Sequence, residues 1–80
     1  MFQQIQLLLI YFELLKDNSI SLELINELGE TVKQILNGED CKKGLHNYQI
    51  NMPSTLSAGS YFIRLKDDRN VYVKKLIFKK

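Results

Sequence analysis

The sequence has little cysteine, histidine or proline, and these shortages exclude several classes of protein. Cys41 is the only cysteine, so no disulfide can form within the chain. With His46 as the only histidine, a structural zinc site also lacks its usual ligands. One proline and no low-complexity tract indicate an ordinary folded chain, and 80 residues suffice for a single domain spanning 1–80. We therefore expect a small domain that depends on its hydrophobic core alone.

Long hydrophobic runs are also missing. The apolar run from Leu7 to Phe12, even when Leu14 and Leu15 are added, is shorter than the roughly 20 residues that a membrane-spanning helix needs. No lysine or arginine precedes the run and no small-residue cleavage site follows it, so it is a poor signal peptide. We expect no stable membrane insertion, and the chain as written has no signal peptide.

The dominant pattern in the sequence is an alternation of apolar and polar residues. Side chains two apart lie on one face of a strand, whereas a helix repeats every three to four residues. Each alternating run therefore predicts a strand with one face toward a core and the other mostly toward water. These runs predict strands near residues 8–15, 19–26, 31–36, 45–51, 60–66 and 71–78.

Turn-forming residue pairs fall between the predicted strands. Glycine, asparagine and aspartate tolerate the backbone conformations of tight turns. The pairs are Asp17-Asn18, Leu28-Gly29, Asn37-Gly38, Lys43-Gly44, Ala58-Gly59 and Asp67-Asp68. Only residues 1–15 and 27–36 also fit a helix, and the first ten residues could add a seventh strand. We predict an all-β protein, an immunoglobulin-like or fibronectin-III-like antiparallel sandwich of six to seven strands.

The residues needed for catalysis are not arranged for it. Several serines are present, but the only candidate base, His46, falls at an inward-facing strand position, where a structural role is expected. The pairs Glu39-Asp40 and Asp67-Asp68 lie at predicted turns, and the chain is too short to build a good cleft around them. There is no glycine-rich phosphate loop, and nothing resembles the spacing of an EF-hand, although calcium at these turns is not excluded. We expect no enzyme activity, no cofactor and no metal.

Cys41 falls in a predicted loop from Asn37 to Gly44, next to Lys42 and Lys43. Neighbouring positive charge can lower the pKa of a thiol and make it reactive. A lone loop cysteine is more often incidental, and its expected consequence is dimerisation on oxidation.

Charge is distributed unevenly along the chain. Residues 1–40 carry a balance of −5, residues 41–59 carry +2, and residues 60–80 carry +5. The lysines near the C-terminus, interleaved with Tyr72 and Phe78, would suit a nucleic-acid surface. Alternatively, lysines protect an edge strand from aggregation and face the acidic strands of the same domain. We favour the second interpretation and expect no nucleic-acid partner.

A local motif supports a sandwich over a barrel. Leu56, Gly59 and Tyr61 form L-x-x-G-x-Y directly ahead of an alternating strand. Immunoglobulin-like sandwiches often place a tyrosine at the start of a late strand, with its hydroxyl bonded to backbone a few residues upstream. We expect Tyr61 to have this structural role.

From Ile10 to Lys80 the ordered set of motifs resembles the C-terminal sorting domain of proteins exported by the type IX (Por) secretion system of Bacteroidetes. In this family an I-x-F-x-L strand is followed by a V-x-L strand, a D-x-x-G-x-x-V turn, a G-x-H segment, L-x-x-G-x-Y and a final strand with paired lysines. The matching segments here are Ile10–Leu14, Ile20–Leu24, Asn26–Val32, Gly44–Tyr48, Leu56–Tyr61 and Lys74–Lys80. The usual N-P entry segment is replaced by Phe2-Gln-Gln-Ile-Gln-Leu.

The resemblance implies a non-catalytic domain that guides an upstream cargo, absent from this chain, across the outer membrane to the surface. It also implies that a protein of the secretion machinery reads the terminal segment Lys74, Lys75, Leu76, Ile77, Phe78, Lys79 and Lys80. Gly29, Gly44, Gly59 and Tyr61 match the positions that form the fold. The alternative is a generic accessory or adhesion module that binds protein or carbohydrate through its 37–44 and 51–59 loops.

Overall fold

Six antiparallel strands make up the described part of the chain. The computed structural model describes residues 6–52 and 55–79. The strands are β1 (Gln6–Leu14), β2 (Asn18–Asn26), β3 (Thr31–Cys41), β4 (Gly44–Met52), β5 (Gly59–Lys66) and β6 (Val71–Phe78). The predicted all-β sandwich is confirmed. Within these ranges there is no helix, and so no segment of the kind that could cross a membrane as a helix. Residues 1–5, which belong to the stretch where a seventh strand was considered, lie outside the described residues.

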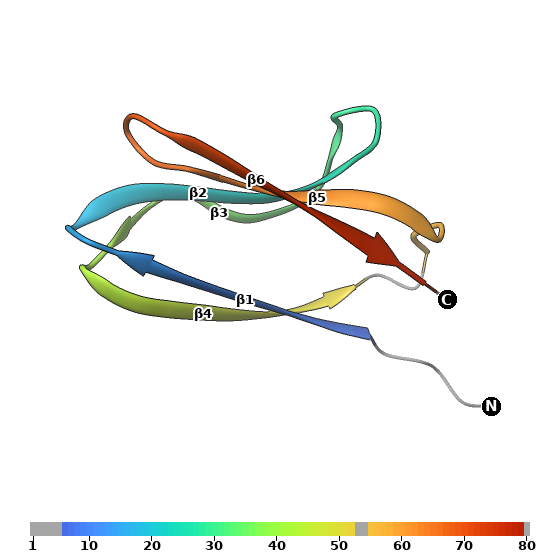
Figure 1. Cartoon of the computed structure of the whole chain (residues 1–80), viewed down its shortest axis with the longest axis horizontal. Helices are drawn as coiled ribbons and strands as arrows, with labels where there is room; N and C mark the ends of the chain where they lie inside the picture. The colour runs from blue at the N-terminus through green and yellow to red at the C-terminus, as the bar shows by residue number, and fades with distance from the viewer. Residues whose placement is uncertain (1–5, 53–54, 80) are drawn as a thin grey trace.

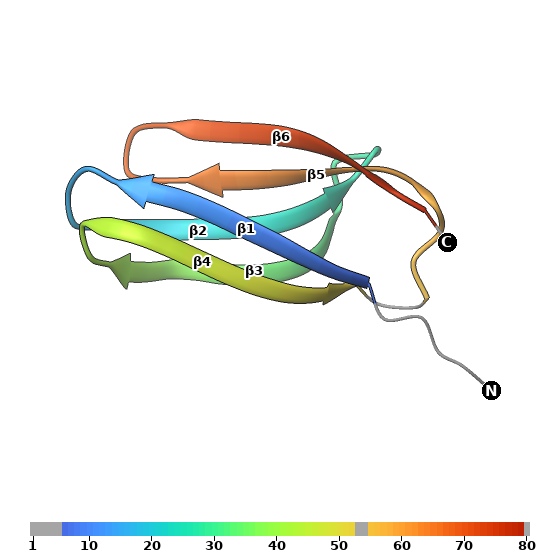
Figure 2. The same ribbon diagram turned by 60° about the horizontal axis from the view of Figure 1, so that its bottom comes forward.

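The strands form two facing layers of unequal size. One sheet has four strands in the order β3-β2-β5-β6, and the other contains β1 and β4 alone. Figure 1 shows the four-stranded sheet above the two-stranded one, and Figure 2 shows β6 lying beyond β1 at one side of the molecule. The chain passes between the sheets from β1 to β2, from β3 to β4 and from β4 to β5. As a result, β1 pairs with β4 and β2 pairs with β5. Such pairing of strands distant in sequence is consistent with an immunoglobulin-like sandwich.

The core lies between the layers, and β2 is its most buried strand. Its alternate residues Ile20, Leu22 and Leu24 have no exposed surface. Leu24 packs with Tyr61 and Phe78 of the same sheet, and with Met52 at the end of β4. A domain of this size buries only about 60% of the surface its unfolded chain exposes, so each of these side chains is a large part of the core.

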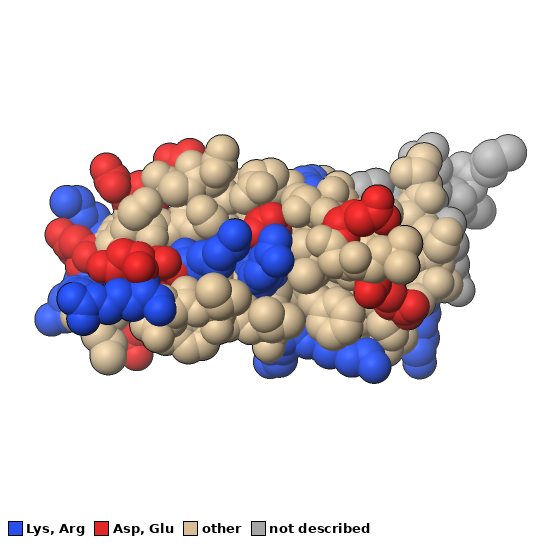
Figure 3. Space-filling model, turned by 90° about the horizontal axis from the view of Figure 1, so that it is seen from above, with Lys and Arg blue, Asp and Glu red and all other residues tan. Residues whose placement is uncertain are grey.

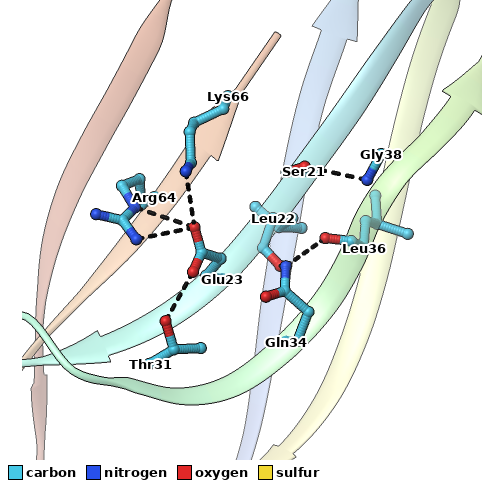
Figure 4. A network of polar contacts seen from close by, with 9 residues as sticks. All are labelled: Ser21, Leu22, Glu23, Thr31, Gln34, Leu36, Gly38, Arg64 and Lys66. Atoms are coloured by element: carbon cyan, nitrogen blue, oxygen red, sulfur yellow. Dashed lines mark hydrogen bonds and ion pairs between the residues drawn. The ribbon is translucent and has the colours of Figure 1, made fainter.

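The Asn37-Gly38 pair does not reverse the chain, and the prediction of a turn there was wrong. β3 continues through it to Cys41, and its pairing with β2 shifts between Ile20 and Leu22, where β3 contains one extra residue. Gly38 has φ = +64°, which a residue with a side chain adopts only at a cost, as expected of a glycine in a bulge. Its N–H donates to the Ser21 hydroxyl at 3.0 Å (Figure 4). The pair therefore bends a strand.

Because β3 is longer than predicted, Cys41 ends a strand and does not lie in an open loop. Its side chain is buried. Burial and the neighbouring Cys41 thiol raise the pKa of the Tyr48 hydroxyl. The expected dimerisation on oxidation loses its basis, because a buried thiol is inaccessible to a second molecule.

His46 is a partly buried residue of β4 with a local partner. Its Nε2 lies 2.6 Å from the Lys42 carbonyl oxygen, and its ring stacks on Phe12 with centroids 5.2 Å apart. The register of β1 and β4 places these two rings opposite each other. This arrangement joins the two strands of the smaller sheet.

Candidate recognition surface

The terminal strand β6 is an edge of the four-stranded sheet, and its two faces differ. It pairs with β5 from Gly59↔Phe78 to Lys66↔Val71 without a shift of register. Leu76 pairs with the buried Tyr61 and packs against the core, and Phe78 is part of that core. The Phe78 ring meets the Tyr61 ring edge-on at 6.2 Å. Two of the seven residues of the predicted recognition segment are thus held inside the sandwich.

Lys74 and Lys75 are exposed and lie on opposite faces of β6. Lys74 pairs with Ile63 on the face toward the smaller sheet, whereas Lys75 pairs with Phe62 on the outer face. Lys79 follows the strand and is exposed, and Lys80 lies outside the described residues. Figure 3 looks onto the outer face of the four-stranded sheet and shows basic side chains along its lower rim.

Large apolar side chains are exposed on the same strand as Lys74 and Lys75. Val71, Tyr72, Val73 and Ile77 each keep more than half of their surface accessible. Exposed apolar residues rimmed by charge are typical of surfaces that bind another protein. β6 therefore combines core contacts at Leu76 and Phe78, a backbone edge that pairs with no further described strand, and exposed basic and apolar side chains.

The positions expected to form the fold lie at turns and strand starts. Gly29 has φ = +83° in the turn between β2 and β3, and its N–H donates to the Asn26 carbonyl at 3.0 Å. Gly44 and Gly59 are the first residues of β4 and β5. The Tyr61 hydroxyl donates to the Ser57 carbonyl oxygen at 2.6 Å, which holds the segment before β5 against that strand.

A buried carboxylate on the outer face of the four-stranded sheet was not predicted. Glu23 is only 6% exposed, although its position alternates with the core residues of β2. It accepts a hydrogen bond from the Thr31 hydroxyl at 2.7 Å and is 3.0 Å from the Arg64 guanidinium and 3.5 Å from the Lys66 ammonium (Figure 4). The bond from Thr31, together with Arg64 and Lys66, holds the pKa of Glu23 below its usual value.

Glu23 should make the stability of the domain depend on pH. A carboxylate with a lowered folded-state pKa stabilises the fold above its unfolded pKa, about 4.3, and this contribution is lost as the pH falls through the folded value. We expect Glu23→Gln to reduce the free energy of unfolding by about 1–3 kcal/mol at pH 7. The difference from the wild type should shrink below about pH 4, measured by urea unfolding across pH.

The exposed Glu27 in the turn after β2 provides a matched control. Glu27→Gln should leave unfolding at pH 7 within about 0.5 kcal/mol of the wild type. Equal losses from both substitutions, or a loss at Glu23 that persists unchanged at pH 3, would contradict this role of the buried carboxylate.

The two loops of the alternative module are shorter than expected. Residues 37–41 belong to β3, so only Lys42 and Lys43 separate β3 from β4. There the Lys42 ammonium lies 3.6 Å from the Asp17 carboxylate, and the Lys43 N–H donates to that carboxylate at 2.8 Å. Asn51 and Met52 end β4, and residues 53–54 lie outside the described part. A binding site built from the 37–44 segment loses its support. Among the described residues no group of three or more potential metal ligands comes together.

The comparisons with known proteins agree with the resemblance found in the sequence. The family model described as the secretion system C-terminal sorting domain matches residues 5–79. No curated protein and no solved structure matches the chain. The matched range covers all six strands, including the whole of β6. The chain belongs to the family of C-terminal sorting domains of the type IX (Por) secretion system.

Proposed function

We propose that this domain is a non-catalytic address label that directs a cargo protein through the type IX secretion system to the cell surface or the exterior. The family match over residues 5–79 carries this proposal. Its cargo is an upstream part of the same polypeptide. Since β1 begins and β6 ends at the same end of the sandwich (Figure 1), a cargo joined before β1 lies near the terminal strand.

The export machinery reads β6 and the residues that follow it. The fold holds this strand in one position, because Leu76 and Phe78 pack into the core while Lys75 and Ile77 face outward. Residues 60–80 carry a balance of +5, so an acidic surface on the machinery would attract this end of the domain. The short 42–43 turn gives no comparable surface to the accessory-module alternative.

The proposal is tested by transplanting the domain. A reporter targeted to the periplasm is fused upstream of residues 1–80 and expressed in a Bacteroidetes host with an active type IX system. We expect the fusion to reach the cell surface or medium, and to stay in the periplasm when the translocon is inactivated. A folded fusion that is retained while a control cargo is exported would contradict the proposal.

A further inference from the structure

The smaller sheet leaves part of the larger one uncovered, and an apolar groove runs along the gap. The groove has a volume of about 1010 Å³ and lies between β1 and β6. Its walls include the inward side chains of β1 and the inner faces of β5 and β6. Its apolar lining includes Ile10, Phe12, Ile63, Leu65, Tyr72 and Leu76. We call this the β1–β6 groove.

One wall of the groove is a free strand edge. β1 pairs only with β4 among the described strands, so the other side of its backbone has unpaired N–H and C=O groups. β1 is also apolar on both faces, with Leu7, Leu9 and Tyr11 exposed on the side away from the core. Strands that are apolar on both faces are typical of positions where other parts of a protein cover both faces.

The other wall has a cation at its centre. Along the inner face of β6 the order is Tyr72, Lys74, Leu76, and the last of these already packs against the core. Within the described residues the structure gives Lys74 no ion pair, whereas Asp67 at the end of the groove accepts hydrogen bonds from the N–H groups of Arg69 and Asn70. An uncompensated ammonium among apolar side chains suits a carboxylate arriving with a ligand.

We propose that the β1–β6 groove binds an extended segment of a protein of the export machinery, which adds to β1 as a third strand of the smaller sheet. The inward side chains of this segment are apolar, with one acidic residue facing Lys74. Strand addition of this kind takes affinity from the main chain and specificity from alternate side chains. The inference rests on the proposed function for the source of the segment, while binding is measured on the isolated domain.

A second copy of the chain does not fit this groove. Antiparallel pairing of two β1 edges would relate the copies by a two-fold axis normal to the sheet, which puts both four-stranded sheets in one layer. Because β6 extends past β1 (Figure 2), each copy's β6 would occupy the space under the other copy's β1. The part of β6 that extends past β1 leaves room beside β1 for a single strand that carries no second sheet with it.

The test uses a fluorescein-labelled peptide, Val-Thr-Val-Thr-Asp-Thr-Val-Thr-Val, which places valines and the aspartate on one face of a strand. A matched peptide has lysine in place of aspartate. Anisotropy titrations compare the wild-type domain with Lys74→Glu and Lys33→Glu. The second substitution makes the same charge change at an exposed residue of β3, the opposite edge strand of the sheet, which does not line the groove. Circular dichroism establishes that all three proteins are folded.

We expect the aspartate peptide to bind the wild type and to lose roughly tenfold or more in affinity for Lys74→Glu, while Lys33→Glu stays within about twofold. The lysine peptide should prefer Lys74→Glu to the wild type. Amide NMR shifts on binding should fall on β1 and β6 and spare β3. Together these results would assign the groove as the binding site.

The proposal is overturned if no binding occurs at about 1 mM peptide, if both lysine variants lose affinity equally, or if the isolated domain forms a stable dimer through β1. Export of the reporter fusion shows whether only the groove proposal fails or whether the proposed sorting function fails. A fusion exported normally with Lys74→Glu would leave the sorting role intact and remove the groove from it. A peptide that binds a domain unable to direct export would contradict the sorting role instead.

Discussion

Phe78→Ala should unfold the domain or bring it close to unfolding, and abolish export with it. Phe78 is 5% exposed and packs against Tyr61 and Leu24 in the central cluster. Removing a buried phenylalanine ring costs about 3–5 kcal/mol. At roughly 0.05–0.15 kcal/mol per residue, a chain of this length has a total stability of about 4–12 kcal/mol. The substitution therefore removes a large part of the stability, and thermal unfolding by circular dichroism measures it.

The adjacent Ile77 serves as the control because it faces outward and is 56% exposed. Ile77→Ala should change the free energy of unfolding by about 0.5 kcal/mol or less. If Phe78→Ala unfolds like Ile77→Ala, the assignment of Phe78 to the core is wrong. The contrast between Phe78 and Ile77 also shows why deleting residues 74–80 is a poor test of recognition. The deletion removes core residues together with the lysines.

Most strand positions were predictable from the period-two alternation. The predicted 71–78 strand coincides with β6, and the predicted 19–26 and 60–66 strands begin one residue later than β2 and β5. Alternation is informative here because one face of each strand is buried, which fixes the spacing of apolar side chains. The tight turns at 67–70 and around Gly29 fall at the predicted Asp67-Asp68 and Leu28-Gly29 pairs, because aspartate and glycine tolerate the backbone conformations of turns.

The bulge in β3 was missed because its local signal is ambiguous. Asn-Gly is favoured both in hairpin turns and wherever a strand needs a residue with positive φ. At Gly38 the deciding factor is the partner strand β2, which continues to pair with β3 as far as Cys41. Whether segments about 20 residues apart pair is decided by the tertiary fold and not by the local sequence. The burial of Cys41, at the end of this pairing, was missed for that reason.

The burial of Glu23 and the exposed inner-face position of Lys74 were missed for a related reason. Alternation places Glu23 on the outer face of β2, but only the register shows that Arg64 lies directly opposite. Lys74 occupies an inner-face position of β6, where alternation alone would predict burial. It is exposed because the smaller sheet has two strands and does not cover β6. For Glu23, the sequence signal that could have been used is the opposite charge of Arg64, if the strands containing the two residues are predicted to pair.

Reversing the charge of the terminal lysines should abolish export without unfolding the domain. Lys74, Lys75 and Lys79 are exposed, so their replacement by glutamate leaves no cavity in the core. Surface substitutions of this kind usually change stability by about 0.5 kcal/mol or less each. The reversal replaces attraction toward an acidic partner by repulsion, and like charges across an interface suppress binding strongly. Loss of export with the fold intact is the expected combination.

A control with the same change in net charge uses Lys33, Lys42 and Lys43, which are exposed on β3 and in the turn after it. It separates a general effect of added negative charge on passage through the translocon from an effect of where the substituted lysines lie in the domain. Unfolding curves of both triple variants must resemble that of the wild type before their export is compared.

The decisive measurement is the fraction of the reporter fusion that becomes accessible to protease on intact cells, compared between the two triple variants. We expect a drop of at least roughly tenfold for the triple variant with Lys74→Glu, Lys75→Glu and Lys79→Glu, and a change within about twofold for the control triple. Equal export of both variants, with both folded, would contradict the claim that the terminal strand is the part of this sorting domain that the machinery reads.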